Sequence, residues 1–290
     1  MADFGVFIFA TDYSIGPVDF SLAAEARGFE SVFFPEHTHI PANRLTPWPG
    51  GTDLPREYWH THDPFIALGA AAAVTNTIKL GTGISLVTER DPIVLAKEAA
   101  TLDFLSDGRL LMGVGAGWNV EEMRNHGTEF AARWAILRER IKAIRTIWTE
   151  EEAEYHGQYV DFDPIWSYPK PKQAGGPKIL IGASSKWTPP RIAEYGDGWF
   201  PIYQNQARAR SQGLLDYREF IGRVLEEWKL ADRSGTPDLT VFGVGPKPDI
   251  VKELIDIGFN RIVFGLPSGN ADEVLPLLDR YAAIGHGVNS

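Results

Sequence analysis

The sequence contains no cysteine, which excludes disulfide bonds, thiolate catalysis and cysteine-ligated zinc or iron–sulfur centres. No uninterrupted apolar run reaches the roughly 18 residues that a membrane-spanning helix needs. The first residues, "MADFGVFIFATDYS", also lack the basic segment and the cleavage site of a secretory signal peptide. We therefore expect a soluble, cytoplasmic protein with no membrane partner.

Positive charge is scarce relative to negative charge. The 28 lysine and arginine residues are outnumbered by 38 aspartate and glutamate residues, and the formal net charge at pH 7 is −10. Proteins that bind nucleic acid or anionic membrane surfaces usually present a basic face. The charge balance therefore predicts no nucleic-acid partner, and an anionic small ligand would need a local basic pocket.

Hydrophobic residues make up 44% of the 290-residue chain, which is enough for a large core. This length allows either two ordinary domains or one large α/β barrel. Short apolar runs that are typical of parallel strands covered by helices recur along the whole chain. The predicted strands are residues 4–10, 31–37, 78–87, 109–117, 178–185, 198–203, 239–245 and 261–266.

Helical patterns separate these runs. Several begin with Asp-Pro or Thr-Pro, a capping residue followed by a proline in the first turn, and several end at glycine. Eight strand-then-helix units predict a single α/β domain over residues 1–290, a (β/α)8 TIM barrel, whose functional residues lie on the loops after the carboxyl ends of the strands. The helical patterns cover residues 17–29, 63–76, 91–108, 130–152, 188–198, 211–235, 247–259 and 271–285.

Two connections are too long to be simple turns. Residues 38–62 follow the second predicted strand and are rich in proline, glycine, tryptophan and histidine. We expect them to form a wall or a lid of a substrate pocket. Residues 156–177 precede the fifth predicted strand, and we expect a small β excursion there.

Three alternating glycines close the fourth predicted strand, in "GVGAG" from Gly113 to Gly117. A dinucleotide-binding loop requires G-x-G-x-x-G after the first strand of its unit, whereas here the sixth position is Trp118 and three strand–helix units come first. Crowded core positions explain Gly113 and also suit Gly115. Gly117, at the end of the strand, is better placed to let a ligand approach the backbone.

A metal site is an alternative at the end of the second strand, where "PEHTHIP" contains Glu36, His37 and His39. Two histidines with a neighbouring carboxylate can act as metal ligands. The ends of the fourth, fifth and sixth strands read "GVGAGW", "LIGASS" and "WFPIY" and offer no further ligand of that kind. We therefore predict no metal.

Small residues and hydroxyls end the fifth strand, from Gly182 to Ser185, just before a helix that begins with Thr-Pro. Hydroxyls beside a helix N-terminus form a suitable seat for a phosphate, and barrels often bind phosphate on their late loops. Lys186 and Arg191 would add positive charge there. A plain turn with serine caps is the alternative.

Three segments carry a resemblance to a known family. They read "FFPEHTHIP", "GTGISLVTERDPIVLAKEAATLDFLSDGRLLMGVGAGWNVEEMRNHG" and "ILIGASSKWTPPRIAEYGDGWFP". Together they resemble the luciferase-like monooxygenase superfamily, and most closely its coenzyme F420-dependent oxidoreductases. The resemblance extends from about the first predicted strand to the last.

The resemblance implies a flavin-type cofactor, which is either F420 or FMN. F420 is a deazaflavin and would transfer a hydride to or from a small organic substrate. FMN would instead support a two-component monooxygenase, in which a separate reductase supplies the reduced flavin. We expect F420, because the histidine segment, the long proline-rich loop and "GVGAGWN" resemble that branch, and we expect a homodimer. A flavin-binding barrel without turnover is the non-enzymatic alternative.

The resemblance also implies the residues of the site. Glu36 and His37 would be catalytic residues beside the cofactor ring, with His37 bonded to the ring or donating a proton to the substrate. The alternative is that His37 only caps or packs its loop. A cis peptide bond at Gly83–Ile84 would support the centre of the ring. The predicted cofactor-binding residues are His37, Gly83, Ile84, Gly115, Ala116, Gly117, Trp118, Asn119, Gly182, Ala183, Ser184 and Ser185.

One departure from the family pattern concerns the substrate. The sugar-phosphate dehydrogenases of the family carry a catalytic glutamate directly after the glycines that close the fourth strand, where this chain has Trp118. We therefore expect no glucose-6-phosphate dehydrogenase activity, and we expect Glu121 and Glu122 to serve the helix dipole. The predicted substrate-pocket residues are His39, Trp48, Trp59, Trp118 and Tyr203.

Overall fold

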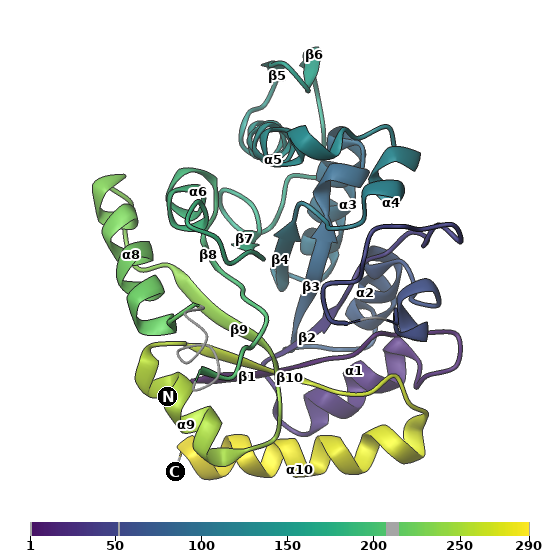
Figure 1. The fold of residues 1–290 in the computed structure, drawn as a ribbon. Coiled ribbons are helices and arrows are strands. Elements are labelled where there is room, and N and C mark those ends of the chain that lie inside the picture. The colour runs from purple at the N-terminus through teal and green to yellow at the C-terminus, as the bar shows by residue number, and fades with distance from the viewer. Residues whose placement is uncertain (1, 52, 207–214, 290) are drawn as a thin grey trace.

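Eight parallel strands close into a barrel in the computed structural model, which describes residues 2–51, 53–206 and 215–289 (Figure 1). Around the barrel the strands follow the order β1, β10, β9, β8, β7, β4, β3 and β2. Each contains residues of one predicted run, so the predicted α/β barrel is confirmed. The barrel strands are β1 (Asp3–Phe7), β2 (Ser31–Phe34), β3 (Lys79–Leu86), β4 (Leu110–Gly115), β7 (Lys178–Ile181), β8 (Gly198–Trp199), β9 (Asp238–Val244) and β10 (Arg261–Gly265).

Helices surround the barrel, and α1 and α10 lie side by side on its outside (Figure 1). The helices are α1 (Pro17–Ala26), α2 (Pro64–Ala72), α3 (Pro92–Leu105), α4 (Val120–Asn125), α5 (Arg133–Thr149), α6 (Thr188–Tyr195), α8 (Tyr217–Leu230), α9 (Pro248–Ile257) and α10 (Ala271–Asn289). Three short 3₁₀ helices are η1 (Arg56–Trp59), η2 (Val87–Glu89) and η3 (Phe130–Ala132).

Capping residues fix where several helices begin. The carboxylates of Asp63 and Asp91 accept hydrogen bonds from the backbone amides of the first turns of α2 and α3, each with a proline next in sequence, as the Asp-Pro pairs predict. Asp216 caps α8 in the same way. Among the described residues, the predicted helix over residues 211–235 therefore begins at Tyr217. Residues 211–214 of the predicted helix lie outside the described residues.

The barrel interior is filled by apolar side chains from strands all around the barrel. Phe33, Leu111, Leu180, Phe200 and Val263 are buried there, while a larger cluster fills the space between the strands and the helices. Burial on both faces explains why the strands read as nearly unbroken apolar runs. Because the interior is packed, a ligand has room only at the ends of the barrel.

Buried charges close the amino-terminal end of the barrel. The guanidinium of Arg261 donates to Glu30 at 2.9 Å and to Asp238 at 2.8 Å, and Arg261 is 3% exposed. Burial raises the pKa of Glu30, but the hydrogen bond and the charge of Arg261 oppose this more strongly and lower the pKa to about 2. This end is therefore sealed, and the open end is the one where the strands finish.

A two-stranded hairpin stands apart from the barrel beyond α5 (Figure 1). It consists of β5 (Ala153–His156) and β6 (Asp161–Ile165), which pair in antiparallel fashion. The β excursion predicted within residues 156–177 therefore begins earlier, at Ala153. The shift has a local cause, because Glu139 of α5 accepts hydrogen bonds from the backbone amides of residues 158–160 and so fixes the turn beside that helix.

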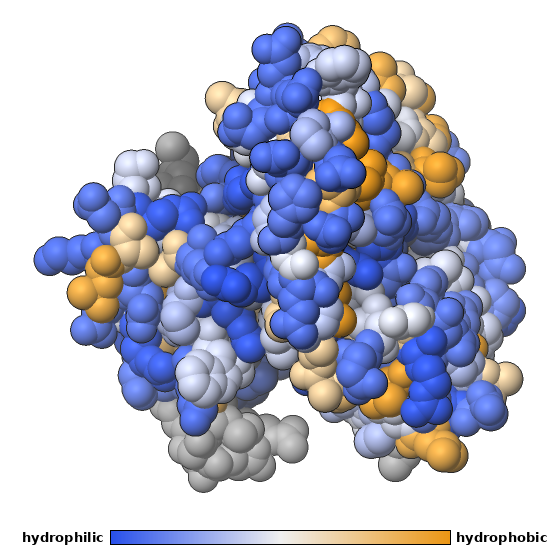
Figure 2. Space-filling model, turned by 90° about the horizontal axis from the view of Figure 1, so that it is seen from above, coloured by the Kyte–Doolittle hydropathy of each residue, from blue (hydrophilic) through white to orange (hydrophobic). Residues whose placement is uncertain are grey.

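The molecular surface seen from the α5 side is mostly hydrophilic, with hydrophobic residues in several separate places, among them the middle and the upper right of the view (Figure 2). Among the described residues, no helix is long and apolar enough to cross a membrane.

Candidate functional site

A cavity of about 270 Å³ opens at the carboxyl-terminal mouth of the barrel. Five of the predicted cofactor-binding residues line it, and they come from β3 and from the loop after β7. Its other walls come from the segment after β8 and from β9. The lining residues are Gly83, Ile84, Gly182, Ala183, Ser184, Phe200, Ile202, Gln204 and Phe242.

One side of this cavity is formed by the peptide bond between Gly83 and Ile84, which is cis, so the bond geometry implied by the resemblance is confirmed. The absence of a side chain at Gly83 keeps the cavity open, since a Cβ there would lie 2.8 Å from Cε2 of Phe242. The pairing of β3 with β4 shifts register between Thr82 and Ser85, around the same bond. The shift brings Ile84 into the cavity wall.

The alternating glycines of β4 have packing roles. A Cβ on Gly113 would lie 2.3 Å from the carbonyl oxygen of Thr82, which confirms the predicted crowded position. A Cβ on Gly115 would lie 2.0 Å from Cδ1 of Ile84. Gly117 has a φ of +75°, in the left-handed region that favours glycine. The three glycines thus fit β4 against β3 and η2, and they form no dinucleotide loop.

His37 and Glu122 form a buried pair. Nδ1 of His37 lies 2.9 Å and 3.0 Å from the two carboxylate oxygens of Glu122, and the two side chains are 7% and 1% exposed. The pair joins the loop after β2 to the first turn of α4. Because Glu122 occupies Nδ1, this nitrogen carries the proton in the hydrogen bond and Nε2 is left for a ligand. Sequence reasoning assigned Glu122 to the helix dipole and missed this contact.

Glu36 lies next to this pair in sequence but faces the other way. Its Oε2 accepts hydrogen bonds from Ser85 Oγ at 2.8 Å and from the Leu86 amide at 2.6 Å, while its Oε1 accepts from Arg90. The Glu36 side chain is 2% exposed. These contacts fasten the end of β2 to the end of β3, so the geometry gives Glu36 a positioning role where the sequence predicted a catalytic one.

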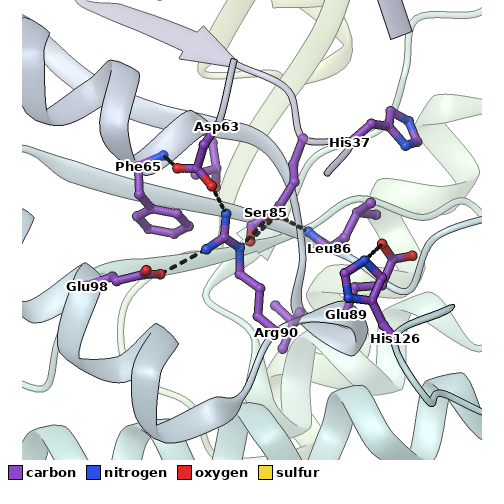
Figure 3. Close-up of polar contacts among 12 residues, drawn as sticks. His37, Asp63, Phe65, Ser85, Leu86, Glu89, Arg90, Glu98 and His126 are labelled. Carbon is purple, nitrogen blue, oxygen red and sulfur yellow. Dashed lines mark hydrogen bonds and ion pairs between the residues drawn. The ribbon is translucent and has the colours of Figure 1, made fainter. Parts of the chain in front are cut away.

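Arg90 is the centre of a cluster of carboxylates (Figure 3). Besides Glu36, its guanidinium binds Asp63 and, at 2.9 Å, Glu98. Figure 3 shows His37 pointing away from this cluster. The negative charge of Glu36 is therefore compensated by Arg90. Glu122 is not part of this cluster and is hydrogen-bonded to His37 instead.

A third buried carboxylate, Glu89, lies close by. Its side chain is 1% exposed, neither oxygen has a hydrogen-bond partner among the described residues, and Nε2 of His126 lies 3.8 Å from one of the two oxygens (Figure 3). Burial raises the pKa of Glu89 to about 9, with smaller contributions from the charges of Glu122 and Glu36. Glu89 is therefore a neutral carboxylic acid at pH 7.

Several predicted cofactor-binding residues have structural roles. Asn119 is 1% exposed and caps α4, where its side-chain oxygen accepts from the amide of Glu122. Ala116 is 2% exposed, and its carbonyl accepts a hydrogen bond from Thr88. Their side chains therefore face the protein interior and do not line the cavity.

The predicted phosphate seat borders a second cavity of about 330 Å³, which shares Ser184 with the first. Ser185 and Lys186 line it as predicted, and the second cation is Arg223 of α8. Arg191, the predicted second cation, instead stacks over the ring of Trp134 at 3.8 Å. Ser185 also has the alternative role of a turn residue, because its Oγ accepts from the amide of Trp187.

The loop over residues 38–62 is attached to α4 and to the segment after β1, and none of its described residues lines the two cavities, so its role as a pocket wall or lid stays a prediction. Glu121 of α4 holds it by accepting hydrogen bonds from the Leu45 amide at 3.1 Å and from Thr46 Oγ1 at 2.6 Å. The other end of the loop bonds to the segment after β1, from the His62 amide to the carbonyl of Ala10 at 2.8 Å. Glu121 therefore anchors the loop, a role that the helix-dipole prediction missed.

Only some predicted substrate-pocket residues lie near His37. The ring of Trp118 lies 6.1 Å from that of His37, and Trp48 lies 5.8 Å from Tyr58, which in turn lies 5.1 Å from His37. Trp59 is 49% exposed and contacts His60.

Two further predicted pocket residues lie elsewhere. His39 is bonded to Asn125 and packs on His126. Tyr203 packs on the core between Ile202 and Gln204, two lining residues of the first cavity. With Glu36 bound to Arg90 and His37 to Glu122, the three residues considered for a metal have separate partners. Within the described ranges, no group of three or more histidine, aspartate or glutamate side chains is arranged to hold a metal ion.

Comparisons with known proteins identify a family and relatives of this chain. The family of luciferase-like monooxygenases matches residues 16–242. An uncharacterized protein of Mycobacterium tuberculosis (strain ATCC 25618 / H37Rv) is 39% identical over 288 residues, which cover 97% of this chain and 97% of that protein. An F420-dependent glucose-6-phosphate dehydrogenase of Nakamurella multipartita is 33% identical over 218 residues, which cover 72% of this chain and 59% of that enzyme.

A solved structure shares the fold. An F420-dependent secondary alcohol dehydrogenase in complex with an F420-acetone adduct superposes with a TM-score of 0.77 at 17% identity, over 100% of this chain and 99% of that chain.

Proposed function

The chain belongs to the luciferase-like monooxygenase family, and on this premise we propose that it transfers a hydride between coenzyme F420 and a small organic substrate. The observation that carries the proposal is the buried His37–Glu122 pair at the mouth of the barrel. An imidazole held by a carboxylate is a suitable proton donor and acceptor near neutral pH. Hydride transfer to a carbonyl compound needs such a group beside the acceptor.

The residues around the cavities fit a deazaflavin. A flat ring system would lie against the Gly83–Ile84 peptide, with Phe200 and Phe242 as apolar walls that exclude water. The anionic side chain of F420 would extend into the adjoining cavity, which is lined by the cations Lys186 and Arg223 and also by the carboxylates of Asp216 and Glu219, and would bind on the side of the two cations. When bound, the deazaflavin supplies or accepts the hydride.

In the proposed mechanism, His37 exchanges a proton with the substrate through Nε2. Glu122 fixes the ring orientation through Nδ1 and stabilises the imidazolium form. Glu36 acts as a positioning residue, because its bonds to Ser85 and Leu86 hold the His37 loop beside β3. In this mechanism His37 transfers the proton, and the two glutamates hold His37 in position.

The FMN-dependent monooxygenase is the second candidate. It is supported by the family name and would require a separate reductase as partner. The curated relatives named as F420-dependent dehydrogenases favour F420. The homodimer and the reductase stay predictions, as does the non-catalytic barrel.

The deciding experiment is a titration of the purified protein with F420 and, separately, with FMN, followed by cofactor and tryptophan fluorescence. We expect tighter binding of F420. Arg223→Gln should weaken F420 binding and reduce its salt dependence, whereas Arg218→Gln, on the same helix, should leave both unchanged. Tighter binding of FMN would favour the monooxygenase. Bound reduced F420 that no substrate reoxidises would favour the non-catalytic barrel.

A further inference from the structure

Aromatic rings form a continuous chain around one side of the barrel mouth. We call this chain the aromatic belt, and it consists of Phe242, Phe7, Phe9, Tyr58 and Trp48, together with Trp118, which is joined to Tyr58 through the ring of His37. The centroid distances are 4.2 Å from Phe242 to Phe7, 5.4 Å from Phe7 to Phe9 and 4.7 Å from Phe9 to Tyr58. The belt therefore begins at the wall of the first cavity and leads to the loop over residues 38–62.

His37 is the polar residue within this belt. Its ring lies 5.1 Å from that of Tyr58 and 6.1 Å from that of Trp118, in an edge-on arrangement with the latter. The rings of the belt are all half-buried, so each keeps part of its surface open. A molecule at Nε2 of His37 would lie among aromatic rings.

The cations near the belt are already engaged. Arg44 lies over the Trp118 ring at 5.5 Å and donates to the carbonyl of Thr46. Arg56 lies over the ring of Tyr13 and donates to His60. The cations near the belt therefore already have partners, and an anionic group placed among the aromatic rings would lose part of its water there.

Buried carboxylates behind His37 add to this preference. Glu36 and Glu122 are both nearly inaccessible, and each has its charge compensated by one neighbour, Arg90 or His37. A phosphate or carboxylate at His37 would compete with Glu122 for the imidazolium charge. The cations that remain for an anion, Lys186 and Arg223, line the other cavity with Ser184.

We propose that the substrate is an uncharged molecule with a planar conjugated or aromatic carbonyl group, bound against Trp118 and Tyr58 with its carbonyl oxygen at Nε2 of His37. This inference rests on the proposed function. In the reducing direction, a hydride from reduced F420 forms the new C–H bond, the π bond breaks, and the proton of His37 Nε2 goes to the oxygen. The substrate gains two electrons and reduced F420 loses them.

The test measures binding of three probes to the protein loaded with oxidised F420, by isothermal titration calorimetry. The probes are 4-phenylbut-3-en-2-one, its saturated analogue 4-cyclohexylbutan-2-one, and glucose 6-phosphate. We expect the conjugated ketone to bind at least tenfold more tightly than either of the others. Equal or tighter binding of glucose 6-phosphate, or of the saturated ketone, would overturn the proposal.

Two variants test whether the conjugated ketone binds at the aromatic belt. The Trp118 ring faces His37 and lines neither cavity assigned to the cofactor, contrary to its predicted cofactor-binding role, so Trp118→Leu should weaken binding of the conjugated ketone at least tenfold and leave F420 affinity within a few-fold. Trp166→Leu, at a tryptophan that is 76% exposed and lies outside the belt, should change neither. An unchanged ketone affinity in Trp118→Leu would contradict the assignment. Trp48→Leu serves as a second belt variant if thermal unfolding shows that Trp118→Leu does not fold.

Failure of this inference and failure of the proposed function give different results. F420 binding without any preference for the conjugated ketone overturns the substrate class alone. Absence of F420 binding contradicts the proposed function, and the same probe titration on the cofactor-free protein then decides whether the belt binds the ketone.

Discussion

The side chain of Ile84 fills the space that a side chain on Gly115 would need, since a Cβ there would lie 2.0 Å from Cδ1 of Ile84. The atom in conflict is the end of a side chain, so Ile84 can rotate into the cavity that it lines. We expect Gly115→Ala to weaken F420 binding at least tenfold and to lower stability by no more than about 2 kcal/mol. Cofactor fluorescence and urea unfolding measure the two effects.

Gly113→Ala is the matched comparison on the same strand. The conflicting atom there is the carbonyl oxygen of Thr82, at 2.3 Å, and backbone in a closed barrel has little freedom to move. We expect a loss of about 3 kcal/mol or more, or no folded protein. Gly69→Ala, in helix α2 with open space at its Cβ, should be neutral or slightly stabilising. Equal stability of the Gly113 and Gly115 variants would contradict this account.

Replacement of His37 tests its chemical role. His37→Gln should reduce turnover by about 10²- to 10⁴-fold, the range typical of general acid–base groups, while F420 affinity changes little. Single-turnover kinetics and cofactor titration measure these quantities. If this variant keeps its turnover, His37 is a loop-packing residue and has no acid–base role.

Replacement of Glu122 tests whether this residue positions His37 or only stabilises the fold. Glu122→Gln removes the carboxylate that holds the imidazole of His37 through Nδ1, so turnover should fall about tenfold or more while F420 affinity changes little. Glu122→Asp, which keeps the carboxylate, should restore part of the turnover. A loss of stability with unchanged turnover would indicate a structural role only.

The Arg90 cluster predicts strong coupling between two residues. Arg90→Met leaves Glu36 buried without its cation and should destabilise the protein by about 3–5 kcal/mol. In the double variant with Glu36→Gln, much of this loss should disappear, because the uncompensated charge is gone. A double-mutant cycle by urea unfolding measures the coupling, and strictly additive losses would argue against it.

Glu89 predicts that stability falls as the pH rises from about 4.5 to about 9. Its pKa is raised from 4.5 in the unfolded chain to about 9 in the folded one, so the unfolded chain loses the proton first as pH rises. The free energy of unfolding should therefore fall between pH 4.5 and 9, by up to about 1.4 kcal/mol per pH unit from this group. Glu89→Gln should flatten this slope, whereas the exposed-site control Glu152→Gln should not. If the free energy of unfolding falls equally steeply with pH in both variants, Glu89 is not the cause of this pH dependence.

Much of the fold was predictable from the sequence because it depends on local patterns. Apolar runs identify the eight strands, and the Asp-Pro pairs at residues 63 and 91 give the helix starts. The hairpin was misplaced because Glu139, on the preceding helix, fixes its turn through contacts that sequence spacing does not reveal.

The candidate site was less predictable, because it depends on side-chain directions between distant segments. His37 and Glu122 are 85 positions apart and meet only through the barrel closure. Arg223 reaches the Ser184 cavity from α8, and nothing in its local sequence marks it. The sequence did offer a signal for Phe200 and Ile202, since both fall at the end of a predicted strand.

Arg90 binds the residues on both sides of the 38–62 loop, Glu36 just before it and Asp63 just after it. One guanidinium thus holds the two ends of this segment together, independently of the residues between them. A loop of different length or sequence would therefore keep this attachment even where it loses the contacts of Leu45 and Thr46 with Glu121. Under the proposed function, grafting between positions 38 and 62 would then change the substrate preference and leave the proposed hydride-transfer site intact.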